Sequence, residues 1–430
     1  MKHIVIIGNS AAGINAAKAI RSQDEKVSLT IISDEKYFGY CRCLISYMLA
    51  GALKEENLII QPEQFYKDLN INLIRGKKAE KINPKKNCVL LEDKTKIDYD
   101  ALIIATGASP KIPEDLKGAG KHGVFGFRTI NDVKDIMELV PISRTACVLG
   151  GGLIGLKAAY GLNKRGLEIK VVVRSNRVLS QMLDEGGAAL FLARFAERGI
   201  EVLTESDVVE VVGNGDVKAV KLNTGKVVGC GIVVVGKGVS PNVKLVKDTE
   251  IKVDKGIVTD DFMCTSINNI FAAGDVAQTL DIIWQAPELN ALWPVAVEQG
   301  KIAGSNALKR IGGKEDKMIK YAGSLSMNAI EFFDLPVISM GMVKVPKDKA
   351  QSYEEIIAAD RAKGIYRKVM LKDNCVVGFI GVGQINNSGV FLKLIKEKTD
   401  VRKIKDDLLS DQFGYARIRE LLSKEETIYV

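Results

Sequence analysis

The clearest pattern in the chain is a unit that occurs twice: a short apolar strand, a glycine-rich turn, a helix with an apolar face and a second apolar strand. The first copy consists of strand 2–8, helix 10–21 and strand 27–32. The second consists of strand 145–149, a helix ending near residue 165 and strand 169–173. Alternating strands and helices predict parallel sheets with covered faces, so we expect an α/β fold with two dinucleotide sites.

The rest of the chain has a less regular pattern. Residues 87–91 and 96–104 predict strands, and Pro110 with Pro113 marks a break into a second domain. The chain leaves that domain near Pro241. Beyond residue 319, strand-like segments precede polar segments predicted as helices that end at residue 430; these strands are 337–343, 366–371 and 376–382. We predict a third, α+β domain there.

Length and composition limit the class of protein. A chain of 430 residues is too long for one core and predicts two or three domains. Its 47% hydrophobic and 27% charged content is ordinary for a soluble globular protein. No apolar run approaches the roughly 20 residues that span a bilayer, and residues 1–8 lead directly into a strand rather than a secretion signal. We therefore expect a cytoplasmic protein.

The seven cysteines form no CxxC motif and no group of four. This spacing argues against a structural zinc site, an internal iron–sulfur centre and a disulfide framework, so no metal site is predicted. Only Cys41 and Cys43 lie close together in the sequence, and the other five stand singly among apolar residues, as buried thiols do.

The net charge of +8 comes from lysines scattered along the chain rather than gathered in one arm. Nucleic-acid binding therefore has little support. Two interpretations stay open: a solvated lysine-rich surface, or electrostatic steering of an acidic partner.

The first glycine turn reads Gly8-Asn9-Ser10-Ala11-Ala12-Gly13, with Ser10 in the place of a second glycine. Gly8 permits a tight turn, Gly13 permits close packing of helix on strand, and a small residue at Ser10 admits a pyrophosphate at the helix start. Asp34, just after the second strand, is placed to bind a ribose hydroxyl. The alternative is a small-residue turn that binds nothing.

Two later segments each lead from a buried strand into a turn of small residues: Tyr99 to Gly107, and Ile267 to Asp275. The three motifs GxSxxG, DxxIIATG and IFAAGD together resemble the FAD-dependent pyridine nucleotide–disulfide oxidoreductase superfamily, over essentially the whole chain. The resemblance implies two Rossmann-like domains, the FAD domain being 1–109 plus 240–317 and the NAD(P) domain 110–239. It also implies that 318–430 is a C-terminal domain that forms a homodimer or docks an electron carrier.

The resemblance assigns cofactor-binding residues to both turns. FAD would be held by Gly8, Ser10, Ala11, Ala12, Gly13, Asp34, Arg42, Ala79, Ala105, Thr106, Gly107, Gly274 and Asp275. The nicotinamide nucleotide would be held by Gly150, Gly152, Leu153, Ile154, Gly155, Arg174, Arg177 and Gly238.

The second nucleotide site departs from the relatives at two positions. Where an acid commonly binds the ribose of NADH, this chain has Arg174, Ser175 and Arg177, which suit the 2′-phosphate of NADPH better. The alternative is that Arg174 stacks on adenine, which is compatible with NADH. Lys157 stands where relatives usually carry a glutamate near the nicotinamide, so that glutamate's role does not transfer; the alternative is a solvent-facing lysine.

The segment around Cys41 and Cys43 bears on the electron acceptor. The glutathione-reductase branch needs a CxxxxC pair and a C-terminal His–Glu dyad. The chain has no CxxxxC pair, and its only histidines are His3 and His122, so this branch is excluded. Tyr40, Arg42 and the following residues resemble rubredoxin reductases and nitrite-reductase flavin domains. Those relatives usually read Y-x-R-P, and this chain has Cys43 in place of the proline. The same position matches the redox cysteine of NADH oxidases and coenzyme A–disulfide reductases. Cys43, and less so Cys41, is therefore a candidate redox thiol.

These features predict an FAD-dependent NAD(P)H oxidoreductase that exchanges electrons with a small acidic iron–sulfur carrier, a ferredoxin or rubredoxin. The resemblance extends to the FAD–NAD oxidoreductases associated with carbon monoxide dehydrogenases. One alternative is a Cys43-dependent NAD(P)H oxidase or a reductase of coenzyme A disulfide or polysulfide. The other is a redox-inactive protein in which FAD is a structural or sensing element.

Overall fold

The computed structural model describes residues 1–345, 351–410, 413–416 and 418. Its contacts divide the chain into two compact units. The first comprises Met1–Lys111, Gly126–Glu138 and Gly238–Ser324; the second comprises Ile112–Phe125, Leu139–Lys237 and Leu325–Val430. The predicted division into three domains is finer than this one and stays a prediction.

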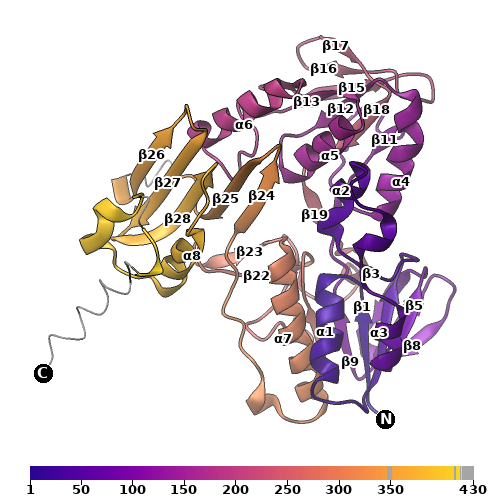
Figure 1. The fold of residues 1–430 in the computed structure, drawn as a ribbon. Coiled ribbons are helices and arrows are strands. Elements are labelled where there is room, and N and C mark those ends of the chain that lie inside the picture. The colour runs from indigo at the N-terminus through magenta and orange to yellow at the C-terminus, as the bar shows by residue number, and fades with distance from the viewer. Residues whose placement is uncertain (346–350, 411–412, 417, 419–430) are drawn as a thin grey trace, which may run out of the picture. The chain divides into compact units, whose positions relative to one another are not determined.

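A five-stranded parallel sheet forms the centre of the first unit, in the order β21 (Ile270–Ala272), β9 (Ala101–Ile104), β1 (His3–Ile7), β2 (Ser28–Ser33) and β5 (Asn72–Arg75). The helices α1 (Ala11–Arg21) and α7 (Trp293–Ile311) lie side by side against it (Figure 1). Glycines allow this close contact, since a Cβ at Gly300 would lie 2.2 Å from the Ala12 carbonyl oxygen.

Smaller elements complete the first unit. A three-stranded antiparallel sheet consists of β6 (Ala79–Asn83), β7 (Cys88–Leu91) and β8 (Lys96–Asp98). The other strands are β3 (Gly39–Tyr40), β4 (Ile59–Gln61), β10 (Ala108–Pro110), β19 (Val239–Pro241), β20 (Ile257–Val258), β22 (Ala277–Asp281) and β23 (Ala286–Glu288). The other helices are α2 (Ile45–Leu49), α3 (Glu63–Asp68), α4 (Ile130–Leu139) and the 3-10 helices η1 (Arg42–Leu44), η2 (Glu55–Leu58), η3 (Pro84–Lys86), η5 (Lys244–Val246) and η6 (Glu315–Lys317).

The second unit contains another five-stranded parallel sheet, in the order β11 (Val124–Phe125), β18 (Ile232–Val235), β12 (Thr145–Leu149), β13 (Glu168–Val172) and β14 (Ile200–Leu203). The helix α5 (Leu153–Lys164) packs on β12 and β13, and α6 (Glu185–Glu197) packs on β14. A short 3-10 helix, η4 (Val140–Ile142), and the antiparallel strands β15 (Val208–Val212), β16 (Ala219–Leu222) and β17 (Val227–Gly229) complete this part.

The C-terminal part of the second unit is an antiparallel sheet, in the order β24 (Met327–Phe332), β25 (Leu335–Gly341), β28 (Cys375–Val382), β27 (Ile365–Lys372) and β26 (Glu354–Asp360). The helix α8 (Ser388–Glu397) packs on β28 and β25, and η8 (Arg402–Asp407) follows it. The helix α6 packs on β27 and β28, so the nucleotide-type sheet and the C-terminal sheet share contacts within this unit.

These observations confirm the predicted α/β class with two parallel sheets and a C-terminal α+β part. The prediction of one strand over 96–104 is wrong, because β8 and β9 belong to different sheets and the chain turns between them. There the Asp100 carboxylate accepts a hydrogen bond from the His3 amide at 2.8 Å. Of the predicted C-terminal helices, the part over 419–430 lies outside the described residues.

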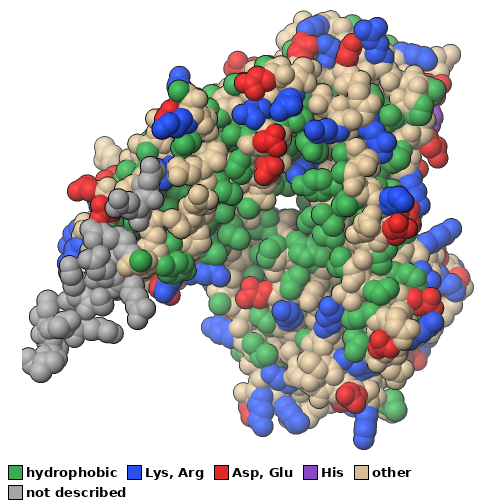
Figure 2. Space-filling view, viewed as in Figure 1, with side chains coloured by type: hydrophobic (Ala, Val, Ile, Leu, Met, Phe, Trp, Pro, Cys, Tyr) green, Lys and Arg blue, Asp and Glu red, His purple; other side chains and the backbone are tan. Residues whose placement is uncertain are grey.

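Two further observations concern the surface. Within the described ranges, no helix is long and apolar enough to cross a membrane. On the face drawn in Figure 2, Lys and Arg side chains are interspersed with Asp and Glu. On that face, the basic side chains are therefore not gathered into one patch.

Candidate functional site

The first glycine turn joins β1 to α1 in the first unit. Gly8 has φ +122°, and a Cβ there would lie 2.1 Å from the Ala105 carbonyl oxygen, so only glycine fits. Ser10 precedes α1 as its N-cap, but within the described chain its side chain caps no amide of the first turn. The first amides of α1 therefore point outward without a side-chain partner, which is the arrangement that binds a phosphate.

Asn9 adds a donor to this turn. Its Oδ1 accepts a 2.7 Å hydrogen bond from the Tyr66 hydroxyl, which itself accepts one from the Gly39 amide at 3.1 Å. These contacts fix the orientation of the Asn9 amide group. Its Nδ2 is buried and has no hydrogen-bond partner among the described residues. A buried donor of this kind fits a bound polar group such as a pyrophosphate oxygen.

The two later motifs end beside the same turn. Thr106 follows β9, and Gly274 follows β21, at the carboxyl ends of strands that are parallel to β1. A Cβ on Gly274 would lie 3.0 Å from that of Ala12, so this segment passes close to the start of α1. Asn242 holds the DxxIIATG segment in place, because its Nδ2 donates to the Thr106 carbonyl at 2.8 Å. The sheet thus brings the three predicted FAD segments to one edge, where nucleotides bind in open α/β sheets.

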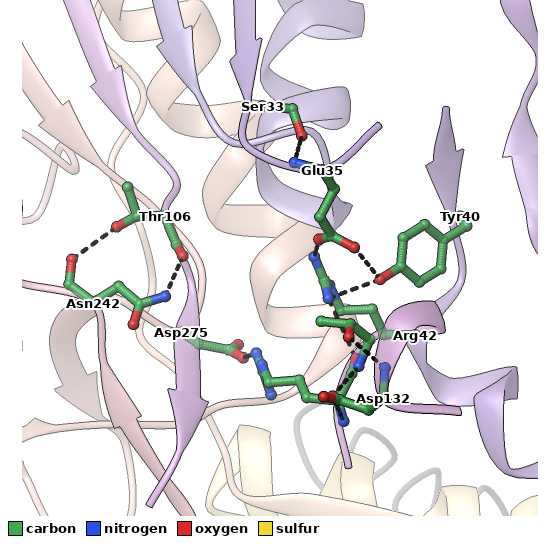
Figure 3. A network of polar contacts seen from close by, with 10 residues as sticks. Ser33, Glu35, Tyr40, Arg42, Thr106, Asp132, Asn242 and Asp275 are labelled. Carbon is green, nitrogen blue, oxygen red and sulfur yellow. Dashed lines mark hydrogen bonds and ion pairs between the residues drawn. The ribbon is translucent and has the colours of Figure 1, made fainter. Parts of the chain in front are cut away.

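Asp275, predicted to bind FAD, has a protein partner that the sequence analysis did not identify. Arg128 donates from Nη2 to Asp275 Oδ2 at 2.5 Å, and both side chains are less than one-fifth exposed (Figure 3). Asp132 holds the Arg128 backbone by accepting from its amide at 2.7 Å. Arg128 lies in no motif of the sequence, so only the three-dimensional structure identifies it.

Arg42 belongs to a second charged group in the same unit. It forms an ion pair with Glu35 and donates to the Tyr40 hydroxyl at 2.9 Å and to the Arg128 carbonyl at 3.3 Å. The Tyr40 hydroxyl donates to Glu35 at 2.6 Å. Figure 3 shows the side chains of Glu35, Tyr40 and Arg42, all from residues 35–42, pointing toward one another. Glu35 therefore fixes Arg42, although the sequence singled out its neighbour Asp34, whose side chain is exposed.

Asp34 and Ala79 are predicted to bind the adenosine part of FAD, and this role stays a prediction. Asp34 follows β2, and Ala79 begins β6. The Lys77 amide donates to the Ser33 carbonyl at 3.0 Å, which brings the segment before Ala79 to the end of β2. Asp34 and Ala79 thus lie near one edge of the sheet.

Cys41 and Cys43 flank Arg42 around η1. Both are free thiols; Cys41 is half-buried and Cys43 is exposed. A hydrogen bond with the Cys43 thiol lowers the pKa of Cys41 to about 6, and the same contact raises the pKa of Cys43. The negative charge therefore favours Cys41, whereas the sequence pattern favoured Cys43 as the redox thiol. The charge of Asp275 also raises the pKa of Cys43, and that of Arg128 lowers it. Cys43 therefore lies near the Arg128–Asp275 ion pair.

The second glycine turn joins β12 to α5 in the second unit. A Cβ at Gly155 would lie 2.3 Å from the Gly150 carbonyl oxygen, so the helix starts in close contact with the turn. Gly152, the N-cap of α5, is exposed, and in the described chain no side chain caps the helix there. Leu153 and Ile154 form the first turn. Their outward amides, with no acid nearby in the first turn, fit a second pyrophosphate.

The two arginines after β13 differ in their contacts. Arg177 is held by the protein: its Nε donates to the Leu183 carbonyl at 3.2 Å and its Nη1 to Asn176 Oδ1 at 3.0 Å. Arg174 is exposed and forms no ion pair within the described residues. Arg174 is therefore the arginine available to a nucleotide phosphate.

Lys157 and Gly238 also differ from simple expectation. Lys157 contacts the C-terminal hairpin: its Nζ lies 3.4 Å from the Glu331 carbonyl oxygen and 5.0 Å from the centre of the Phe332 ring. Lys157 is also partly exposed, so the solvent-facing alternative stays open. Gly238 belongs to the first unit, where its carbonyl accepts a 2.9 Å hydrogen bond from the Lys111 amide.

Two family models match the chain. The model described as pyridine nucleotide-disulphide oxidoreductase matches residues 2–300, and the model described as rubredoxin NAD+ reductase C-terminal domain matches residues 327–399. The second match coincides with the antiparallel sheet and α8.

Named relatives agree with these matches. The chain is 32% identical over 286 residues to a rubredoxin-NAD(+) reductase of Ectopseudomonas oleovorans, covering 65% of this chain and 73% of that protein. It is 28% identical over 428 residues to the assimilatory nitrate reductase electron transfer subunit of Bacillus subtilis, covering 99% of this chain. The chain spans only 53% of that longer relative.

A solved structure also resembles the chain over most of its length. The NAD-dependent persulfide reductase from A. fulgidus is 26% identical, with a TM-score of 0.86 and coverage of 94% of this chain and 78% of that one. The predicted family and cofactor pair are confirmed by these comparisons. The protein therefore belongs to the pyridine nucleotide-disulphide oxidoreductase family, whose members bind FAD and NAD(P)H.

Proposed function

We propose that this protein takes hydride from a nicotinamide nucleotide and passes electrons to a small acidic iron–sulfur carrier, a ferredoxin or rubredoxin. The observation that carries the proposal is the match of residues 327–399 to the C-terminal domain of rubredoxin reductases. The similarity to the rubredoxin-NAD(+) reductase of Ectopseudomonas oleovorans supports it. The net charge of +8 favours a partner of opposite charge.

The residues of the first unit have defined roles in this proposal. FAD, when bound, accepts hydride and releases electrons one at a time. The amides at the start of α1 and Asn9 Nδ2 would bind its pyrophosphate, and Arg128 would hold Asp275 in place. Arg42, oriented by Glu35, keeps a positive charge beside the site. Asp34 and Ala79 would bind the adenosine end.

The residues of the second unit would bind the nicotinamide nucleotide. The amides of Leu153 and Ile154 would bind its pyrophosphate at the start of α5. Arg174 has no competing ion pair in the described chain, so we propose that it binds the 2′-phosphate of NADPH. The alternative, stacking of Arg174 on adenine, would permit NADH. A homodimer and a cytoplasmic location stay predictions.

A second candidate is a thiol-dependent reductase of a persulfide, polysulfide or coenzyme A disulfide. The low pKa of Cys41 and its contact with Cys43 favour it, because a thiolate is the form that attacks sulfur. The similarity to a persulfide reductase supports it as well. No histidine is available in the C-terminal segment to handle thiol protons, so we rank it second.

Anaerobic reduction of the purified protein distinguishes these candidates. The flavin is mixed with NADPH or NADH, and the reduced enzyme is then offered ferredoxin, rubredoxin, coenzyme A disulfide or polysulfide. We expect rapid bleaching of the flavin and transfer to an iron–sulfur carrier. Transfer only to the sulfur compounds, with uptake of about four electrons rather than about two, would support the thiol reductase. No bleaching by either nucleotide would support a redox-inactive FAD protein.

A further inference from the structure

A chain of two hydrogen bonds connects three segments of the first unit and ends at the first glycine turn. The Gly39 amide on β3 donates to the Tyr66 hydroxyl at 3.1 Å, and this hydroxyl donates to Asn9 Oδ1 at 2.7 Å. Tyr66 lies on α3, 57 positions after Asn9, and is only 3% exposed. No motif of the sequence includes Tyr66, so the fold alone brings it to the turn.

The direction of this chain follows from the groups that form it. A backbone N–H can only donate, so the Gly39 amide requires the Tyr66 oxygen as an acceptor. The hydroxyl proton then needs an acceptor of its own, which on Asn9 is Oδ1 and not Nδ2. If the Asn9 amide group were turned over, two donors would face the hydroxyl and its proton would lose this partner. Tyr66 therefore sets which end of the Asn9 amide group points away from it.

Close packing holds the Tyr66 hydroxyl in place. Its ring packs edge-on against Phe65, with ring centres 5.0 Å apart, and lies beside Phe38 at 5.8 Å. A Cβ at Gly39 would lie 3.0 Å from the Tyr66 hydroxyl oxygen, so a glycine there lets the two segments approach. Burial raises the pKa of Tyr66, so its hydroxyl keeps the proton that it donates to Asn9.

Asn9 Nδ2 is the end of this arrangement that the protein leaves open. It is buried and has no hydrogen-bond partner among the described residues. Asn9 belongs to the glycine turn before α1, where the first amides have no side-chain cap within the described chain. A buried donor beside such amides suits an anionic oxygen. The opposite orientation of Asn9 would direct its Oδ1, an acceptor, at that anion.

We propose that Tyr66 is a positioning residue for FAD, because its hydroxyl orients the Asn9 amide group so that Nδ2 donates to the cofactor pyrophosphate. The inference rests on the proposed function, in which the first glycine turn binds this pyrophosphate. Without the hydroxyl, the Asn9 amide group has to be ordered when FAD binds, and the cost of that ordering weakens binding. Tyr66 also holds the Gly39 amide, so it joins the pyrophosphate turn to the segment that leads into Arg42.

Four variants and a control test this role. Tyr66→Phe removes the hydroxyl and keeps the ring, Asn9→Ala removes the amide group, and the double variant shows whether the two residues act together. Asn9→Asp keeps the acceptor for Tyr66 and replaces the donor with an oxygen. The matched control is Tyr99→Phe, because Tyr99 is 4% exposed and its buried hydroxyl has no hydrogen-bond partner within the described residues. The measurement is the rate of FAD release from the diluted holoenzyme, followed by flavin fluorescence.

We expect FAD release to be about three- to tenfold faster in Tyr66→Phe and about tenfold faster in Asn9→Ala. The double variant should match Asn9→Ala, because Tyr66 acts through Asn9. Asn9→Asp should release FAD faster than Asn9→Ala, since its carboxylate would repel the pyrophosphate. Tyr99→Phe should release FAD at the wild-type rate.

Wild-type release from Tyr66→Phe, or from Asn9→Ala, would overturn the positioning role. So would a further loss when Tyr66→Phe is added to Asn9→Ala, because general damage to the fold acts in both backgrounds. If Tyr66→Phe does not fold, equal release from Asn9→Asp and Asn9→Ala would overturn the inference instead. A wild-type protein that holds no FAD would refute the proposed function itself, an outcome distinct from bound FAD without this dependence on Tyr66.

Discussion

Arg128 Nη2 donates to Asp275 Oδ2 at 2.5 Å, joining the start of α4 to the turn after β21. The two residues are 147 positions apart, and the contact ties the segment Gly126–Glu138 to the FAD-type sheet of the first unit. A Cβ at Gly107 would lie 3.8 Å from the same guanidinium, so Arg128 also lies beside the DxxIIATG turn. Arg128 therefore links two of the predicted FAD segments.

Replacing Arg128 with methionine should weaken FAD binding. The change leaves the partly buried Asp275 carboxylate without its partner, at a cost of about 2 kcal/mol, or roughly 30-fold in affinity. The ratio of flavin absorbance to protein after dialysis measures the loss. Arg144→Met is the matched control, because Arg144 pairs with Glu168 on the surface with its side chain 88% exposed. Equal FAD retention in both variants would contradict this role.

Replacing Arg174 with leucine should raise the KM for NADPH about tenfold and leave the KM for NADH nearly unchanged. The reason is that a charge-assisted contact with a 2′-phosphate has no counterpart in NADH. Arg177→Leu serves for comparison. It should lower thermal stability more than nucleotide selectivity, since Arg177 bonds the Leu183 carbonyl. A parallel loss with both nucleotides in Arg174→Leu would instead indicate stacking on adenine.

The thiol pair predicts a pH dependence of alkylation. Because the pKa of Cys41 is lowered to about 6, its reaction with iodoacetamide should rise with pH through about 6 and level off above it. In Cys43→Ala the hydrogen bond is lost, so the midpoint should move up toward the ordinary thiol value of about 8.5. Peptide mapping by mass spectrometry assigns the modified residue. A midpoint near 8.5 in the wild-type protein would contradict the hydrogen bond between the two thiols.

The C-terminal sheet contacts α6 through an ion pair between the buried Lys368 and the partly buried Asp184. Asp184, the N-cap of α6, accepts from the Tyr366 hydroxyl at 2.6 Å and pairs with Lys368 at 3.1 Å. Lys368 is only 4% exposed and also pairs with Glu355 at 2.8 Å. Burial alone would raise the pKa of Asp184, but the hydrogen bonds and the ammonium group together lower it.

Asp184→Asn should reduce the free energy of unfolding by about 1–3 kcal/mol, since asparagine still caps the helix but the buried Lys368 loses one of its two carboxylate partners. The lowered pKa means that this contribution is complete above the ordinary value of about 3.9 and is lost as pH falls through the lower folded value. Calorimetry of both proteins should therefore show the difference shrinking in acid. Asp216→Asn, at an exposed pair with His122, should change little.

Most of the fold could be predicted from the sequence because the repeated strand–turn–helix unit has a strong periodicity. The predicted strand 96–104 was wrong for a physical reason. Its first half, Lys96 to Asp98, pairs with the neighbouring strand β7 as a hairpin, whereas its apolar second half, Ala101 to Ile104, pairs with β1, which is distant in the sequence.

Residues of the candidate site could be predicted from the sequence where the backbone itself requires a glycine, as at Gly8 and Gly155. Arg128 and Glu35 were missed because single charged residues have no signature until the fold brings them to Asp275 and Arg42. Lys157 was recognised as unusual, but its partner Phe332 lies in another part of the chain. The preference for Cys41 over Cys43 likewise depends on a thiol–thiol contact that spacing alone does not define.

The most direct test of the account is electron transfer to an iron–sulfur carrier by the wild-type protein and by the double variant Cys41→Ser/Cys43→Ser. Under anaerobic conditions, NADPH or NADH supplies the electrons, and the absorbance of ferredoxin or rubredoxin reports its reduction. The account predicts that both proteins reduce the carrier at rates within about threefold of each other, because the thiols line the site rather than relay electrons. A wild-type protein whose flavin is reduced but which transfers nothing to either carrier, or a double variant that has lost the transfer, would contradict it.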